Sequence, residues 1–133
     1  MPLPITAATT GALALLLLFL AILTVKQRFR MKVAFGDSGD PALIAASRSH
    51  GNLAEHAPIV LIMLGLLEFA QVNSTALISI AAVFVVARLA HAIGLHQPSE
   101  PGQAPLPRQL GVVLTWVVML VLAALNLFFA FVP

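Results

Sequence analysis

Hydrophobic residues fall in four long runs, and short polar segments separate each run from the next. The runs predict helices over about residues 5–26, 41–69, 74–95 and 107–132. Each run is long enough to cross the roughly 30 Å of hydrocarbon in a bilayer, which takes about 20 helical residues. The pattern therefore predicts an all-α membrane protein, built as a single domain of four transmembrane helices over residues 1–133.

The segments between the runs contain the residue types that end and start helices. Residues 35–40 are rich in Gly and Asp, and Asp40 followed by Pro41 is typical of an N-cap with proline at the first helical position. Residues 71–75 are short and uncharged, and residues 97–107 contain four prolines. We therefore expect a loop or turn at each of these three places.

The composition agrees with a membrane setting. Hydrophobic residues make up 60% of the chain and charged residues 9%, and the mean hydropathy is +1.02. Soluble domains carry about 25% charged residues. The net charge of +2 would suit a nucleic-acid partner, but the basic residues lie at helix ends, as in membrane proteins, so no such partner is expected. Cysteine is absent, which excludes disulfides and thiolate metal sites.

The basic residues also determine the expected orientation. Lys and Arg follow the first run and none precedes it, the reverse of a cleaved signal peptide, so this run is expected to be retained. The loops after the first and third helices carry nearly all of these residues, and the turn after the second carries none. The positive-inside rule then places both loops in the cytoplasm and both chain ends on the outer side.

The second helix carries a polar stripe. At about 100° per residue, Arg48, Asn52 and Glu55 fall within a sector roughly 60° wide. Only twelve residues separate Glu55 from Glu68, about 18 Å of helix, so one of the two glutamates must lie at or within the membrane boundary. Glu68 can be hydrated beside the outer turn. The stripe is then expected just inside the cytoplasmic boundary, facing a protein interior, a partner chain or a polar ligand.

The third helix brings further polar residues to the same depth. Arg88 and His91 are three residues apart and share one face of this helix. His56 is expected at the same depth on the second helix. A neutralising pair of Glu55 with either Arg48 or Arg88 would explain the cluster without any ligand. The spacing of the histidines, six for one pair and five for the other, differs from the i, i+4 pair of a helical metal site, so no metal is expected.

Arg108 lies in the first turn of the fourth helix, where the helix dipole disfavours a cation. Two interpretations remain open for it. Its side chain either extends to the lipid headgroups or pairs with an anionic ligand at the cytoplasmic face.

Two motifs resemble the MAPEG family, the membrane-associated proteins of eicosanoid and glutathione metabolism. The resemblance extends over essentially the whole chain and is strongest to small bacterial members. The motifs are Arg48-x-x-x-Asn52-x-x-Glu55-x-x-Pro58 and Ala87-Arg88-x-x-His91-x-x-Gly94.

The resemblance implies a MAPEG-like homotrimer in a bacterial inner membrane, with periplasmic chain ends and glutathione as co-substrate between subunits near the cytoplasmic face. Arg108 lies at the head of the fourth helix, where eicosanoid-metabolising members hold the arginine proposed to activate the glutathione thiol, and the resemblance therefore implies a catalytic role for it. The chain has no tyrosine, and His56 and His91 stand where the family usually has one. The positions that match glutathione-binding residues of the family are Arg48, Asn52, Glu55, His56, Arg88 and His91.

The function that follows from the resemblance is a membrane-bound, glutathione-dependent transferase or peroxidase. Its second substrate would be a hydrophobic small-molecule electrophile that arrives from the membrane lipid. One alternative is a non-catalytic scaffold of the same fold that binds lipid or glutathione. Another is a small multidrug transporter, which would be expected to carry an acidic residue in the middle of its first helix, and residues 5–25 contain none.

Overall fold

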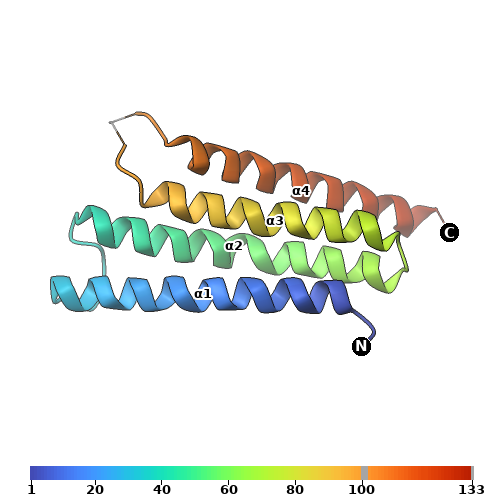
Figure 1. The fold of residues 1–133 in the computed structure, drawn as a ribbon, viewed down its shortest axis with the longest axis horizontal. Helices are drawn as coiled ribbons and strands as arrows, with labels where there is room; N and C mark the ends of the chain where they lie inside the picture. The colour runs from blue at the N-terminus through green and yellow to red at the C-terminus, as the bar shows by residue number, and fades with distance from the viewer. Residues whose placement is uncertain (100–101, 133) are drawn as a thin grey trace.

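The computed structural model describes residues 1–99 and 102–132. These residues form four helices, α1 (Pro4–Met31), α2 (Pro41–Phe69), α3 (Ser74–Leu95) and α4 (Leu106–Phe131). The two chain ends and the α2–α3 turn lie at one end of the bundle, and the α1–α2 and α3–α4 loops lie at the other (Figure 1). We call these the terminal end and the basic end. Glu100 and Pro101, in the loop expected over residues 97–107, lie outside the described residues.

All four helices are long and apolar enough to cross a membrane. Large apolar side chains such as Leu15, Phe19 and Leu120 are exposed on the outside of the bundle. Exposed apolar side chains on every helix suit contact with lipid or with another protein chain, and they would be unfavourable in water. The structure thus has the surface of a membrane-embedded bundle.

Helix α1 is longer than its apolar run. The sequence predicts an end near residue 26, and the helix continues through the basic segment to Met31. Lysine and arginine are good helix formers, and a cation in the last turn interacts favourably with the helix dipole. The apolar run therefore marks the membrane-spanning part of this helix and not its full length.

The basic end of α1 is fastened to the start of α2. Asp40 is the N-cap of α2, and its side chain accepts a 2.8 Å hydrogen bond from the backbone N–H of Leu43. The same carboxylate lies 2.5 Å from the Arg30 guanidinium. The hydrogen bond from Arg30 is the main reason that the pKa of Asp40 is lowered from its ordinary value, with the Leu43 N–H acting in the same direction. Arg28 also donates to the carbonyls of Ala34 and Gly36, which holds the loop against α1.

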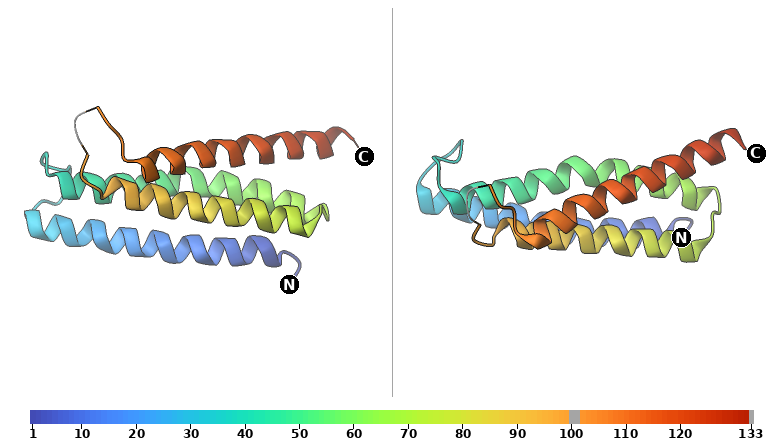
Figure 2. Two further views of the ribbon diagram at one scale, coloured as in Figure 1. Left: turned by 45° about the horizontal axis from the view of Figure 1, so that its top comes forward. Right: turned by 90° about the horizontal axis from the view of Figure 1, so that it is seen from above.

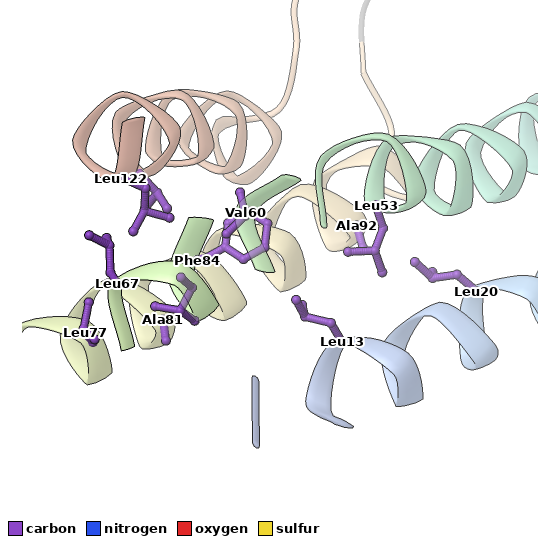
Figure 3. Close-up of a cluster of buried hydrophobic side chains, with 12 residues drawn as sticks. Leu13, Leu20, Leu53, Val60, Leu67, Leu77, Ala81, Phe84, Ala92 and Leu122 are labelled. Carbon is purple, nitrogen blue, oxygen red and sulfur yellow. The ribbon is translucent and has the colours of Figure 1, made fainter. Parts of the chain in front are cut away.

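The core is a column of apolar side chains that all four helices share (Figure 3). Successive core positions are three, four, seven or eight residues apart, which keeps them on one side of each helix. Phe84 of α3 is fully buried near the middle of the column. The members are Leu13, Leu20, Leu53, Val60, Leu64, Leu67, Leu77, Ala81, Phe84, Ala92, Val118 and Leu122.

Helices α2 and α3 form the centre of the bundle. Helix α1 packs mainly on α2 and α4 mainly on α3, and within the described residues α1 and α4 do not contact each other. Helix α4 is tilted, so that it moves away from α3 towards its C-terminal end (Figure 2). There Asn126 of α4 donates a 3.1 Å hydrogen bond to the carbonyl of Met63 in α2. The closest backbone approach of α3 and α4 lies towards the basic end, at Gly94 and Gly111.

Glu68 binds the first turn of α1 at the terminal end. Its carboxylate accepts hydrogen bonds from the backbone N–H groups of Ile5 and Thr6, both at 2.7 Å, and from the Thr6 hydroxyl at 2.6 Å. The first N–H groups of a helix have no partner within the helix, and α1 has no side-chain cap of its own. The sequence indicates only hydration for Glu68, whereas the structure shows that it caps a different helix.

We predict that Glu68→Ala selectively loosens the first turn of α1. Loss of a helix cap costs about 0.5–2 kcal/mol. Amide exchange at Ile5 and Thr6, measured by hydrogen–deuterium exchange in detergent micelles, should accelerate by about 3–30-fold, since 1.4 kcal/mol is a factor of about ten. Thr10→Ala is the matched control, because the Thr10 hydroxyl bonds only to its own helix. Equal exchange in both variants would contradict the capping role.

Candidate functional site

A polar pocket lies at the basic end between α2, α3 and α4. Its volume is about 230 Å³, and the polar groups that line it are cations, imidazoles, an amide and a hydroxyl. Apolar side chains, among them the exposed indole of Trp116, complete the lining. The lining residues are Arg48, Asn52 and His56 of α2, Arg88, His91 and Leu95 of α3, and Arg108, Val112, Thr115 and Trp116 of α4.

Arg88 is the central residue of the pocket and only 3% exposed. Its Nη1 donates to the Asn52 side-chain oxygen at 2.5 Å, which links α3 to α2. Its Nη2 donates to the Gly111 carbonyl at 3.1 Å and to the Thr115 hydroxyl at 2.5 Å, which links α3 to α4. The guanidinium also lies over the Phe84 ring, 5.8 Å from its centroid. One side chain thus connects three helices.

The charge of Arg88 has no counterion among the described residues. Its protein acceptors are an amide, a carbonyl and a hydroxyl, all neutral, and its Nε is buried without a hydrogen-bond partner. In the part of the chain that the structure describes, no carboxylate lines the pocket, while Arg48 and Arg108 add two further cations. A buried charge is costly unless it is paired. The pocket is therefore chemically suited to an anion.

Two glycines allow the helices to meet beside the pocket. A Cβ added at Gly111 would lie 2.6 Å from the Cβ of His91 and 2.7 Å from the carbonyl oxygen of Ala87. A Cβ added at Gly94 would lie 2.7 Å from the Cα of Arg108. Contacts this close require glycine, so these two positions bring the start of α4 against α3. The close approach also places the Gly111 carbonyl within reach of Arg88.

The two pocket histidines differ in their surroundings. His91 is 6% exposed, and its Nδ1 lies 3.4 Å from the carbonyl oxygen of Arg108, which is long for a hydrogen bond. His56 is half-buried, and its Nδ1 lies 2.8 Å from the carbonyl oxygen of Asn52, one turn earlier in α2. Only the His56 ring is oriented by a short hydrogen bond.

Glu55 lies outside the pocket. The sequence groups it with Arg48 and Asn52 on one stripe, but Asn52 turns toward Arg88, whereas Glu55 is exposed at the edge of the stripe. In the described part of the chain the ion pair joins Arg30 to Asp40, and Glu55 pairs with neither Arg48 nor Arg88. A neutralising pair within one chain therefore does not explain the cluster.

The structure brings together six of the seven residues that the sequence singles out, and it adds Thr115. Sequence reasoning missed Thr115 because a hydroxyl in an apolar run is common and usually bonds to its own helix, as Thr115 also does to Gly111. The available signal was its position two turns after Arg108, which places both residues on one face of α4.

Comparison with known proteins gives consistent results. The family model described as "MAPEG family" matches residues 6–128. The chain is also 29% identical over 116 residues to the inner membrane protein YecN of Escherichia coli strain K12, an alignment that covers 87% of this chain and 85% of the relative. The YecN protein of Escherichia coli O6:H1 gives the same values. Together with the four apolar helices, these matches show an integral membrane protein.

We predict that Gly111→Ala destabilises the bundle and disturbs the pocket. The added methyl has no space against His91 and Ala87, so α3 and α4 must separate. Overpacking of this kind costs about 1–3 kcal/mol, to be measured as the free energy of unfolding in detergent. The control is Gly11→Ala, where a Cβ meets nothing within 4 Å, and where alanine should stabilise a helix by about 0.5–1 kcal/mol. Equal stability of the two variants would refute the close-packing role of Gly111.

Proposed function

Because the chain belongs to the MAPEG family, we propose that it is a glutathione-dependent transferase or peroxidase that acts on hydrophobic electrophiles in the membrane. The observation that carries this proposal is the buried Arg88, whose charge has no counterion among the residues that the structure describes and which lies in a pocket lined by two further arginines. An anionic ligand would compensate this charge.

Glutathione fits the chemistry of the pocket. The tripeptide has two carboxylates and one ammonium group, so it carries a net negative charge and needs cations more than anions from the protein. Arg48 can bind a carboxylate through two parallel hydrogen bonds. Glu55, exposed next to the pocket, is available for the ammonium group. This division of roles explains why the single carboxylate of the stripe lies outside a pocket of cations.

Arg108 is the residue that we propose to stabilise the thiolate. It lines the pocket from the first turn of α4, where the N-terminal end of the helix adds positive potential. A nearby guanidinium and a helix N-terminus both favour the charged form of a thiol. The thiolate would then attack an electrophile that reaches the pocket from the lipid side, where the exposed Trp116 lies.

We further propose that three copies assemble and that glutathione binds between neighbouring subunits. The exposed Glu55 and the exposed apolar side chains of all four helices support this arrangement, since a neighbouring chain would cover both. The basic end would face the cytoplasm and both chain ends the periplasm of a bacterial inner membrane.

A second candidate is a scaffold that binds glutathione or lipid without turnover. It is favoured by the absence of tyrosine. A tyrosine hydroxyl can donate a hydrogen bond to glutathione, and a histidine ring at the same position is shorter, so its nitrogens lie at a different distance from the ligand.

We expect the purified protein to bind glutathione in isothermal titration calorimetry. Arg48→Ala should weaken binding by about 10–100-fold, since a hydrogen bond to a charged group is worth about 1.5–3 kcal/mol. Lys26→Ala, an exposed cation of α1 outside the pocket, is the control and should bind as the wild type does.

Conjugation of glutathione to 1-chloro-2,4-dinitrobenzene then distinguishes an enzyme from a non-catalytic scaffold that binds glutathione. If the wild type binds no glutathione, both of these proposals are overturned. If Arg48→Ala binds glutathione as tightly as the wild type, only the assignment of the binding site is overturned.

The trimer has a separate test. Native mass spectrometry from detergent micelles should give three times the mass of one 14.0 kDa chain. A monomer or dimer as the largest species would contradict the proposed assembly. The result does not depend on whether glutathione binds.

A further inference from the structure

The orientation of His56 defines its protonation pattern. A carbonyl oxygen only accepts hydrogen bonds, so the 2.8 Å contact with the Asn52 carbonyl means that Nδ1 of His56 carries the hydrogen. In the neutral imidazole, Nε2 is then an acceptor with a free lone pair. The ring lines the pocket and its Nδ1 is turned back to its own helix, so Nε2 is the nitrogen that can meet a ligand.

The groups around this nitrogen are cations and neutral donors. Arg48 faces the pocket from α2, Arg88 and His91 from α3, and Arg108 from α4, while α1 contributes no residue to the lining. Arginine is always protonated and cannot accept a proton. The remaining candidate is His91, but it is almost fully buried against α4, and its 3.4 Å contact does not fix its tautomer. His56 is therefore the lining group that the structure prepares as a proton acceptor.

We propose that His56 is the general base that takes the proton from the thiol of the bound ligand. This inference rests on the proposed binding of glutathione in the pocket. The S–H bond breaks, its proton forms an N–H bond at Nε2, and the electron pair stays on sulfur as a thiolate beside the imidazolium. The thiolate forms a carbon–sulfur bond with the electrophile, and the leaving group departs with its electron pair. The imidazolium then releases its proton to water.

The mechanism makes a measurable distinction between His56 and the arginines. If arginines alone stabilise the thiolate, the thiol proton must leave for the solvent when glutathione binds. If His56 accepts it, the proton stays on the protein. Thiolate formation is followed by ultraviolet difference absorbance, and proton release by calorimetry in buffers that differ in ionisation enthalpy. At neutral pH we expect a thiolate signal with little proton release.

Two variants of His56 separate its roles. His56→Asn places an amide nitrogen near the position of Nδ1 and can keep the hydrogen bond to the Asn52 carbonyl, but it has no proton acceptor at Nε2. His56→Gln offers an amide group near Nε2 that cannot take a proton. Both should still bind glutathione, lose the retained-proton signature, and, with glutathione at saturation, conjugate 1-chloro-2,4-dinitrobenzene about 10²–10⁴-fold more slowly.

The matched control is His50→Gln, because His50 lies on the same helix and does not line the pocket. It should behave as the wild type in all three measurements. The proposal is overturned if the wild type releases one proton for each thiolate formed, or if both His56 variants keep the wild-type rate. Absence of glutathione binding in the wild type would instead overturn the proposed function on which this step depends.

Discussion

The arrangement of the basic end depends on one buried cation. Arg88 is buried in the bundle without a counterion among the described residues, where its hydrogen-bond acceptors are neutral groups of α2 and α4. The two acceptors of α4, the Gly111 carbonyl and the Thr115 hydroxyl, are within reach because two glycines let α4 approach α3 closely. The same side chain thus links three helices and adds a positive charge to the pocket. A smaller, apolar residue would remove the donor to the Asn52 side-chain oxygen and leave the Thr115 hydroxyl with only its bond to Gly111.

A simpler constraint acts at the helix ends. The backbone N–H groups of a first turn have no acceptor within their own helix, and in an apolar setting they need hydrogen bonds from elsewhere. Asp40 caps α2, and Asn73 caps α3. Helix α1 has no cap of its own, and the carboxylate of Glu68 supplies one from α2. Two of the acidic residues, Asp40 and Glu68, therefore cap helix ends, whereas Glu55 remains exposed outside the pocket.

The hydrophobic pattern predicted the helices well because span length and loop chemistry are local properties. It underestimated the length of α1, because the polar residues that continue this helix to Met31 do not belong to the hydrophobic run. It also brought Arg48, Asn52 and Arg88 to one level correctly, because rise per residue is fixed. Helical periodicity places Glu55 on the same side of α2 as Arg48 and Asn52. Which of these side chains contacts a neighbouring helix depends on how the helices pack, and there Asn52 faces Arg88 while Glu55 is exposed. The capping role of Glu68 could not be predicted from the sequence either, because it depends on how α1 packs against α2. The N–H groups that Glu68 binds lie more than 60 residues away in the chain.

The bond between Glu68 and α1 also bears on the order in which the chain assembles. Helix α1 leaves the ribosome first, with the N–H groups of its first turn unsatisfied until the end of α2 has been made. The two helices therefore complete each other's polar groups as a hairpin, joined by Glu68 at one end and by Arg30 with Asp40 at the other. This hairpin is complete once α2 has been made, with contacts at both of its ends, and α3 and α4 are synthesised after it.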